Sequence, residues 1–333
     1  MDITKVVNQL KQKYKDVNVV SESEDPSDFV STGNLTFDLI SEGGIPFGVM
    51  TEFVGFSQSG KSLFIQQILA NAQKKYDAVG VIVDRENALT NKRAVELGID
   101  TDKMIKVGPQ DTPLVVDAFN FLIDTINLIR KEDGDTYIVG IVDSIQAFDK
   151  DVDLDKSDSG RRAKSIKDGL RKLFPIIDKK VMLLIANHFY YNVGQMFGDP
   201  KRVAGGEGLR YFNTNRFALE DKLKIMDSKK GGEVVGNWIG IEVQKTRLGP
   251  CYRTCYIPFF YKEGIPYYGG YIRFLVQRGY LKPKNKQEFS KFRQQTVVYK
   301  DKSYNEFNAE KLLEDHPELL FDKYPEYYQG GEK

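Results

Sequence analysis

The sequence predicts an α/β fold: a mostly parallel sheet with an antiparallel extension, a short N-terminal helix and a small C-terminal region. Two observations lead to this prediction. Apolar strands alternate with helices from Ser31 onward, and closely spaced strands with Gly, Pro and aromatic residues follow Tyr211. With 333 residues and 41% apolar content, the chain can bury a large core.

The N-terminal segment is predicted to be an amphipathic helix over residues 4–15. Its apolar side chains fall on one stripe, which consists of Val6, Val7, Leu10 and Tyr14. A polar linker follows from Val17 to Phe29. A helix this short cannot bury its stripe against itself, so we expect it to dock on the chain's own core or on a neighbouring subunit.

The central segment carries the alternating pattern. Strands are predicted at 49–54, 79–84, 104–107, 137–143 and 181–187, and helices over 61–74, 112–130 and 163–178. The later strands, at 216–219, 238–245, 252–260 and 269–274, are interpreted as an antiparallel extension of the same sheet. Beyond Leu281 a helix is expected over 308–315, ended by Pro317.

Bulk composition restricts the class of protein. No apolar run reaches membrane-spanning length and the N-terminus lacks a secretory layout, so we expect a cytoplasmic protein without membrane partners. A formal charge of +1 does not by itself indicate nucleic acid binding. One basic cluster, Arg161, Arg162, Lys164, Lys167, Arg171 and Lys172, follows an acidic run, a pattern that also fits a solvated helix face.

The most informative motif fits the phosphate-binding P-loop at every fixed position. It consists of Gly55, Phe56, Ser57, Gln58, Ser59, Gly60, Lys61 and Ser62, between a predicted strand and a predicted helix. Glycines let the backbone wrap a triphosphate, so that N–H groups and the helix N-terminus face the anion. We expect Lys61 to reach the β- and γ-phosphates of ATP and the Ser62 hydroxyl to bind Mg²⁺.

Three further strand ends supply candidate chemistry. Asp143 closes an apolar strand in the manner of a Walker B element and is expected to hold Mg²⁺, directly or through water. Glu86 is the candidate general base for hydrolysis, with Asp84 as its competitor. His188, which follows Asn187 at the end of another buried strand, is well placed to contact the γ-phosphate.

The segment from Phe189 to Gly206 is long, aromatic and glycine-containing, and it is basic at Lys201 and Arg202. Aromatic side chains interleaved with Lys and Arg suit single-stranded nucleic acid, because bases stack on the rings and phosphates contact the cations. A segment of this length without clear periodicity, inside a compact domain, is more often functional or disordered than padding.

These motifs together resemble the RecA family of DNA strand-exchange recombinases, most closely its bacterial and bacteriophage branch. The resemblance lies in residues 31–38, 43–48 with the P-loop, 143–144, 196–200 with 205–206, 245–247 and 264–269. It spans residues 31–281, which would form a RecA-like P-loop NTPase core. Residues 1–30 would then be an N-terminal oligomerisation helix with its linker, and residues 282–333 a small C-terminal region.

The resemblance implies roles for individual residues. Glu86 would activate water, with Lys61 and His188 as the other catalytic groups. Lys245 and Arg247 would reach the ATP of the adjacent subunit, Tyr268 would belong to the nucleotide site, and Tyr211 would lie at a subunit contact. Residues 150–162 and 189–206 match two DNA-binding loops, which would place on DNA Arg161, Arg162, Tyr190, Met196, Phe197, Lys201, Arg202, Gly205 and Gly206.

The sequence also departs from the family pattern. His188 stands where most bacterial members carry glutamine, which adds a titratable group near neutral pH. Arg85 and Asn87 flank Glu86 in place of smaller or aromatic residues. The match beyond Leu281 is weak.

The resulting hypothesis is a Mg²⁺-dependent, DNA-stimulated ATPase that forms helical filaments on single-stranded DNA and pairs it with double-stranded DNA, with loading or mediator proteins as possible partners. Two alternatives stay open. One is a RecA-like regulatory or mediator ATPase without strand exchange, and the other is a hexameric ring motor on DNA.

Overall fold

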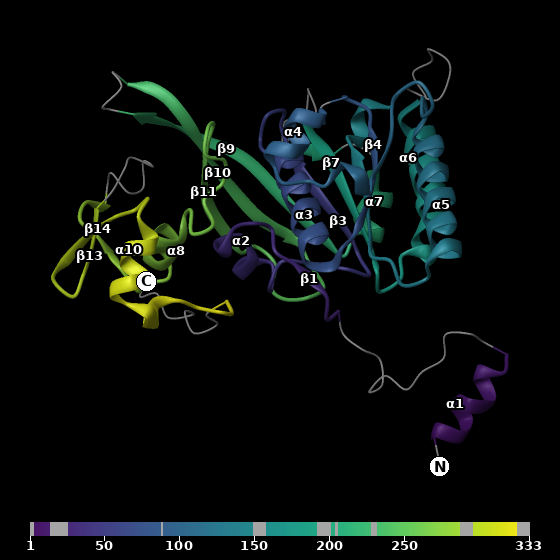
Figure 1. The fold of residues 1–333 in the computed structure, drawn as a ribbon, viewed down its shortest axis with the longest axis horizontal. Helices are drawn as coiled ribbons and strands as arrows, with labels where there is room; N and C mark the ends of the chain where they lie inside the picture. Colours follow the sequence, from purple (N-terminus) through teal and green to yellow (C-terminus); the bar gives the residue numbers. More distant parts are fainter. Residues whose placement is uncertain are drawn as a thin grey trace.

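The computed structural model describes residues 3–13, 26–87, 89–148, 158–191, 201–203, 206–227, 232–286 and 296–324. The strands of the main sheet are β3 (Met50–Gly55), β4 (Val79–Asp84), β5 (Met104–Val107), β6 (Ile138–Asp143), β7 (Val181–Tyr191), β8 (Lys201–Val203), β9 (Asn215–Asp227), β10 (Glu233–Lys245) and β11 (Thr254–Phe260). They form a nine-stranded sheet in the order β11-β10-β9-β3-β7-β6-β4-β5, with β8 paired to β7 (Figure 1).

Helices cover both faces of this sheet, as the sequence predicts. After the N-terminal helix, the described α-helices are α2 (Leu35–Ile40), α3 (Lys61–Tyr76), α4 (Asn91–Glu96), α5 (Val115–Glu132), α6 (Asp158–Leu173), α7 (Gly206–Phe212), α8 (Tyr271–Gln277) and α10 (Ala309–Asp315), of which α10 belongs to the C-terminal region. Short 3₁₀ turns occupy 101–103, 145–147, 174–176 and 317–319. One core cluster joins the sheet to α2 and α3 through Phe37, Phe53 and Phe64, and a second joins it to α5 and α6 through Phe119 and Leu170. The α/β prediction is therefore confirmed.

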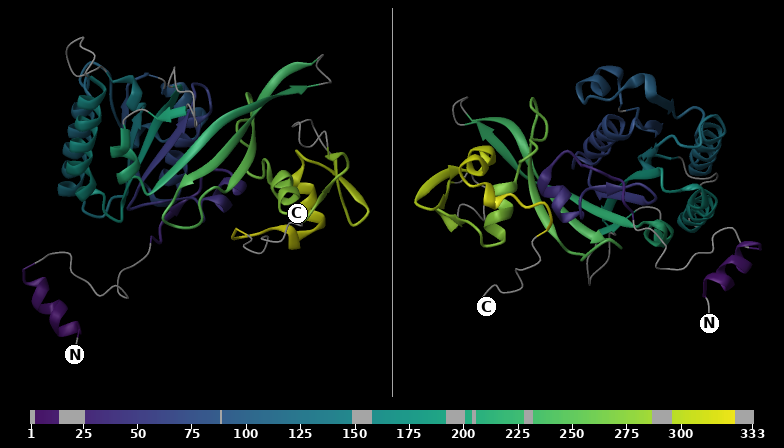
Figure 2. Two further views of the ribbon diagram at one scale, coloured as in Figure 1. Left: turned by 180° about the vertical axis from the view of Figure 1, so that it is seen from behind. Right: turned by 60° about the horizontal axis from the view of Figure 1, so that its bottom comes forward.

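The parallel part of the sheet is larger than predicted. β3, β4, β5, β6 and β7 pair in parallel, and β9 also lies parallel to β3. The antiparallel extension therefore begins only at β10, which pairs with β9 and β11. β9 and β10 are longer than the predicted 216–219 and 238–245, because each continues into a hairpin that projects beyond the core in Figure 2.

The predicted strand at 269–274 is wrong, since this segment enters helix α8. All five residues from Tyr271 to Leu275 are buried, so this helix is surrounded by the protein and has no polar face that would give a helical pattern in the sequence. Gly270 precedes the helix at φ 81°, and a Cβ there would lie 1.9 Å from the Tyr256 carbonyl oxygen. Only glycine tolerates that backbone conformation beside a neighbouring strand.

The N-terminal helix α1 (Ile3–Lys11) forms as predicted and lies apart from the sheet in both views of Figure 2. Val7 is buried, whereas Val6 and Leu10 are 42% and 40% exposed. Tyr14 and residues 17–25 of the predicted linker lie outside the described residues. The chain enters the core at β1 (Phe29–Val30), which pairs with β2 (Ile45–Pro46).

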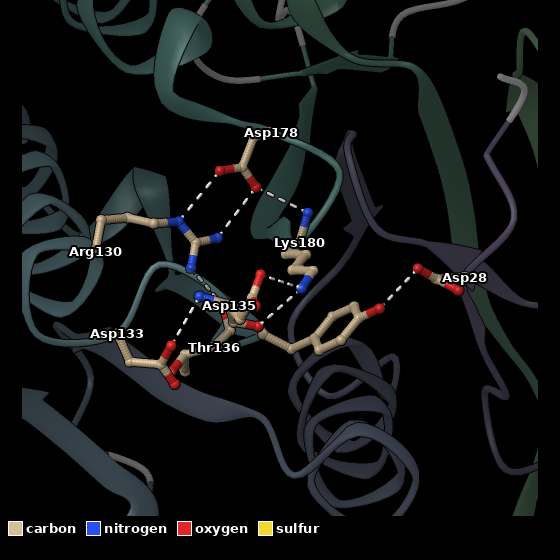
Figure 3. Close-up of polar contacts among 8 residues, drawn as sticks. Asp28, Arg130, Asp133, Asp135, Thr136, Asp178 and Lys180 are labelled. Atoms are coloured by element: carbon tan, nitrogen blue, oxygen red, sulfur yellow. Dashed lines mark hydrogen bonds and ion pairs between the residues drawn. The ribbon is translucent and has the colours of Figure 1, made fainter. Parts of the chain in front are cut away.

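The amino edge of the sheet is closed by a polar network (Figure 3). Arg130, at the end of α5, donates two hydrogen bonds of 3.1 Å to the Asp178 carboxylate. Lys180 contacts Asp135 at 2.8 Å, and the Tyr137 hydroxyl donates to Asp28 at 2.8 Å. These contacts fix the loops at one edge, and the opposite, carboxyl edge carries the P-loop.

The C-terminal region forms a three-stranded sheet of β12 (Lys282–Pro283), β13 (Thr296–Tyr299) and β14 (Lys302–Asn305), followed by α10. The helix expected over 308–315 is confirmed, with Asn308 as its N-cap. Phe307 stacks on the buried Trp238, and Arg273 pairs with Glu306 at 2.8 Å in the interior.

In the part of the chain that the structure describes, no helix is long and apolar enough to cross a membrane.

Candidate active site

The loop between β3 and α3 has the geometry that a phosphate cradle requires. A Cβ at Gly55 would lie 2.3 Å from the Ser59 hydroxyl and 2.5 Å from the Leu219 carbonyl oxygen. Gly60 has φ 93° and caps α3, and a Cβ there would lie 2.8 Å from the Ile239 side chain. Both positions therefore require glycine, and the loop brings its N–H groups to the positive end of α3.

Lys61 lies inside this loop. Its ammonium donates to the carbonyl oxygens of Gly55 at 3.1 Å and Phe56 at 2.8 Å, and the residue is only 5% exposed. Burial lowers the pKa of Lys61 to about 8, partly opposed by Asp143 and Glu86. Within the described residues, the buried Ser59 hydroxyl has no hydrogen-bond partner. An anion in the loop would satisfy both groups, so these residues fit a nucleotide phosphate.

Asp143 and Ser62 come together beside Lys61. A hydrogen bond joins the Ser62 hydroxyl to the Asp143 carboxylate, which is 4% exposed. Burial raises the pKa of Asp143 to about 6. The described residues contain no cluster of three or more His, Cys, Asp or Glu that could hold a metal. One hydroxyl and one carboxylate fit Mg²⁺ when phosphate oxygens complete the coordination.

Glu86 and His188 face each other across the ends of β4 and β7. The two side chains approach to 3.5 Å, and the Ser144 hydroxyl donates to Glu86 at 2.7 Å. Burial and nearby Lys61 lower the pKa of His188, so the ring is neutral near pH 7 and can donate a hydrogen bond. The sequence predicts that His188 changes its charge near neutral pH; the lowered pKa moves this change to a lower pH range.

Asp84, the competitor of Glu86, is committed to a structural role. Its carboxylate is 1% exposed, pairs with Lys106 at 2.8 Å and accepts the Leu89 backbone N–H at 3.0 Å. Glu86 is 45% exposed and contacts the polar groups that end β6 and β7. A base must reach water, so the geometry favours Glu86.

Arg85 was not identified as a site residue from the sequence. Its guanidinium donates to the carbonyl oxygens of Pro109 at 2.7 Å, Thr112 at 3.0 Å and Ala147 at 3.3 Å. It also lies 5.2 Å from the centroid of the Phe148 ring. Arg85 thus ties the turn that carries Glu86 to the loops after β5 and β6.

Glu52 was also missed. It lies in the middle of β3 with no exposed surface, and its carboxylate accepts hydrogen bonds from Asn187 at 2.8 Å, Arg216 at 2.7 Å and Asn213. The signal in the sequence is a lone acid within an apolar strand, which requires buried partners. The partners follow far along the chain, beyond the reach of local pattern.

The predicted second DNA-binding loop is a β-hairpin at its described ends. β7 continues past Asn187 to Tyr191, and Tyr190 and Tyr191 pair with Arg202 and Lys201 of β8. Tyr190 is 45% exposed. Gly206 is the first residue of α7.

Several residues predicted to contact DNA lie outside the described residues. They are Met196, Phe197 and Gly205, together with the first predicted loop from residue 150 to residue 157. Arg161 and Arg162 lie in helix α6, and their side chains are likewise outside the description.

Lys245 and Arg247 lie far from the phosphate loop of their own chain. The Lys245 ammonium donates to the carbonyl oxygens of Arg210 and Asn213 at the end of α7, and Arg247 donates to Tyr211 at 3.5 Å. β10 runs antiparallel to β9, and β9 is parallel to β3, so Lys245 falls level with the amino half of β3. Tyr211 beside them is 73% exposed.

Tyr268 lies in the turn between β11 and α8. Its ring contacts Tyr267 at 4.9 Å and packs partly buried against the core, and the neighbouring Gly269 carbonyl accepts from Asn34 at 2.9 Å. Its assignment to the nucleotide site stays a prediction.

The family model described as RecA N-terminal domain matches residues 2–266. The chain belongs to the RecA family. The match covers the P-loop, the Asp143 strand and the β7–β8 hairpin, so the resemblance drawn from the motifs is confirmed.

Individual relatives extend this similarity to most of the chain. Protein RecA of Aquifex aeolicus is 28% identical over 299 residues, which cover 87% of this chain and 80% of that protein. Protein RecA of Gluconacetobacter polyoxogenes is 29% identical over 325 residues, 95% of this chain and 88% of the relative. Protein RecA of Ureaplasma parvum serovar 3 is 30% identical over 261 residues, which cover 76% of this chain and 74% of the relative.

Proposed function

We propose that this RecA family member is an ATP-dependent recombination protein that assembles on single-stranded DNA and promotes pairing and strand exchange. The observation that carries the proposal is the convergence, in a RecA family chain, of Glu86 and His188 at the carboxyl edge of the sheet that holds the P-loop. A hydrolytic site requires a base and a hydrogen-bond donor at that edge.

The residues present divide the work of hydrolysis. The P-loop N–H groups and Lys61 would bind the phosphates, and Ser62 and Asp143 would hold Mg²⁺, which neutralises phosphate charge when bound. Glu86, oriented by Ser144, would position and deprotonate water, and neutral His188 would donate to the γ-phosphate.

Assembly would complete the site. Because Lys245 and Arg247 project at the opposite edge from the P-loop, they can stabilise phosphate charge only on a neighbouring subunit. The exposed Tyr211 and the detached helix α1 would form the contact between subunits, in keeping with their sequence assignments. The DNA surface would include Tyr190 and Arg202 on the β7–β8 hairpin.

The test is steady-state ATP hydrolysis with and without single-stranded DNA over a range of salt, with wild-type protein and Glu86→Gln. We expect stimulation that weakens with salt, because phosphate contacts release counterions. Glu86→Gln should keep ATP and DNA binding but lose about 100-fold or more in kcat. Chelation of Mg²⁺ should abolish turnover.

Each alternative has its own outcome. Nucleotide binding without DNA stimulation would support the regulatory ATPase in place of the recombinase. Closed rings by electron microscopy would support the ring motor. Equal turnover in Glu86→Gln would contradict the assignment of Glu86.

A further inference from the structure

The two basic residues of β8, both assigned to DNA from the sequence, occupy different environments. Lys201 and Val203 are half-buried and Val203 packs against a small cluster with Phe189, whereas Arg202 between them is exposed. Successive side chains of a strand point to opposite faces. Lys201 therefore faces the sheet and Arg202 faces away from it.

Lys201 contacts a carboxylate and two aromatic rings on that sheet face. Its ammonium forms an ion pair with Glu220 of β9, and each side chain is 32% exposed. It also lies 5.9 Å from the ring centroids of both Phe56 and Phe189, within cation–π range. The two rings lie 5.6 Å apart.

This contact joins the hairpin to the nucleotide loop. Phe56 is the second residue of the P-loop, and its carbonyl accepts the Lys61 ammonium at 2.8 Å. Phe189 directly follows His188, which faces Glu86. Lys201 thus packs on the side chain of one P-loop residue and on the neighbour of the proposed γ-phosphate sensor.

We propose that Arg202 is the DNA-contacting cation of β8 and that Lys201 is a positioning residue. Through Glu220 and the Phe56 and Phe189 rings, Lys201 fixes the hairpin relative to the P-loop, so that nucleotide binding alters DNA affinity. The inference rests on the proposed function and names the residues that couple its two sites.

The experiment compares charge-matched variants of the full chain. Binding of a fluorescent oligothymidylate is measured over a salt series, with a non-hydrolysable ATP analogue and Mg²⁺ and also without nucleotide. The variants are Lys201→Gln, Arg202→Gln and Glu220→Gln, with the exposed Lys224→Gln and Glu233→Gln as charge controls. The charge-exchanged pair K201E/E220K tests whether the ion pair itself matters.

Arg202→Gln should reduce the slope of log affinity against log salt by about 0.7 for each phosphate that the protein no longer binds. Lys201→Gln should keep the wild-type slope, but it and Glu220→Gln should both reduce the effect of nucleotide on DNA affinity, by about fivefold or more. The charge-exchanged pair should restore only part of that effect, because an ion pair can form in either orientation but the cation near the Phe56 and Phe189 rings is lost.

A slope change for Lys201→Gln equal to that of Arg202→Gln would overturn the inference, since Lys201 would then contact phosphate. An unchanged nucleotide effect in both Lys201→Gln and Glu220→Gln would also overturn it, since neither side chain would then couple the two sites. Wild-type protein that does not bind the oligonucleotide would instead refute the proposed DNA function, and the inference with it.

Discussion

The Glu52–Arg216 pair provides the most direct test of the buried polar network behind the site. Glu52 has no exposed surface and Arg216 is 9% exposed, with 2.7 Å between the Glu52 carboxylate and the Arg216 Nε. Arg216→Met removes the guanidinium cation and puts an unbranched apolar side chain in its place. The carboxylate then stays buried, and among the described residues its remaining side-chain donors are the Asn187 and Asn213 amides.

Removal of one partner of a buried ion pair costs about 3–5 kcal/mol. Because two amide donors remain, we expect the lower end, a loss of about 3 kcal/mol in the free energy of unfolding. The double variant Glu52→Gln with Arg216→Met removes the buried charge, and its carboxamide oxygen can still accept from Asn187. Its NH2 group can donate to the Asn213 Oδ1, which has no partner among the described residues, once the Asn213 amide turns, so this variant should recover about 2 kcal/mol of that loss.

Urea denaturation followed by far-UV circular dichroism measures these differences, provided that the slope of the unfolding free energy against urea concentration is the same in all variants. Arg171→Met is the control, because Arg171 is 61% exposed and its pair with Asp168 should contribute less than about 1 kcal/mol. The reasoning fails if Arg216→Met costs no more than this control, or if the double variant is no more stable than the single one.

Three further predictions concern other parts of the molecule. Because the pKa of His188 is lowered, the ring is neutral above its ordinary value near 6.5 and charged only below it. The ratio of kcat in His188→Gln to kcat in the wild type should therefore be constant from pH 7 to 8 and change only at lower pH, since the titration of Lys61 and Asp143 is common to both proteins; paired pH–rate profiles measure this ratio, and a ratio that is constant at every pH would contradict the assignment. Arg85→Met should lower kcat by about tenfold or more, because it removes the hydrogen bonds that hold the turn carrying Glu86. The P-loop keeps its own contacts, so KM for ATP should change little, and a rise in KM as large as the fall in kcat would contradict this role. Tyr137→Phe removes the hydrogen bond to Asp28 and should lower the free energy of unfolding by about 1 kcal/mol. Tyr261→Phe, which changes an exposed tyrosine, is the control, and an unchanged urea midpoint in Tyr137→Phe would show that this bond adds nothing to stability.

The residues that could be predicted from sequence belong to local patterns. A phosphate cradle needs glycines at a fixed short spacing between a strand and a helix, so the P-loop could be recognised directly. Asp143, Glu86 and His188 lie at or just beyond the ends of apolar runs that the parallel sheet aligns at one edge.

The residues that escaped prediction depend on pairings made by the whole fold. Glu52 meets Arg216 only because β9 lies parallel to β3, and Arg85 meets carbonyl oxygens of two separate loops. The segment 269–274 has aromatic and β-branched residues that suit a strand as well as a buried helix, and the left-handed Gly270 decides between them.

The separation of Lys245 and Arg247 from their own P-loop makes the two ends of any linear assembly chemically different. In a head-to-tail chain of subunits as proposed above, every internal P-loop would receive the basic pair of its neighbour. The terminal subunit at one end would keep a P-loop that receives none, and the subunit at the other end would keep a Lys245 and Arg247 pair that faces no nucleotide. ATP bound at the first of these ends would therefore turn over more slowly than ATP in the interior, so the assembly would lose and gain subunits unequally at its two ends.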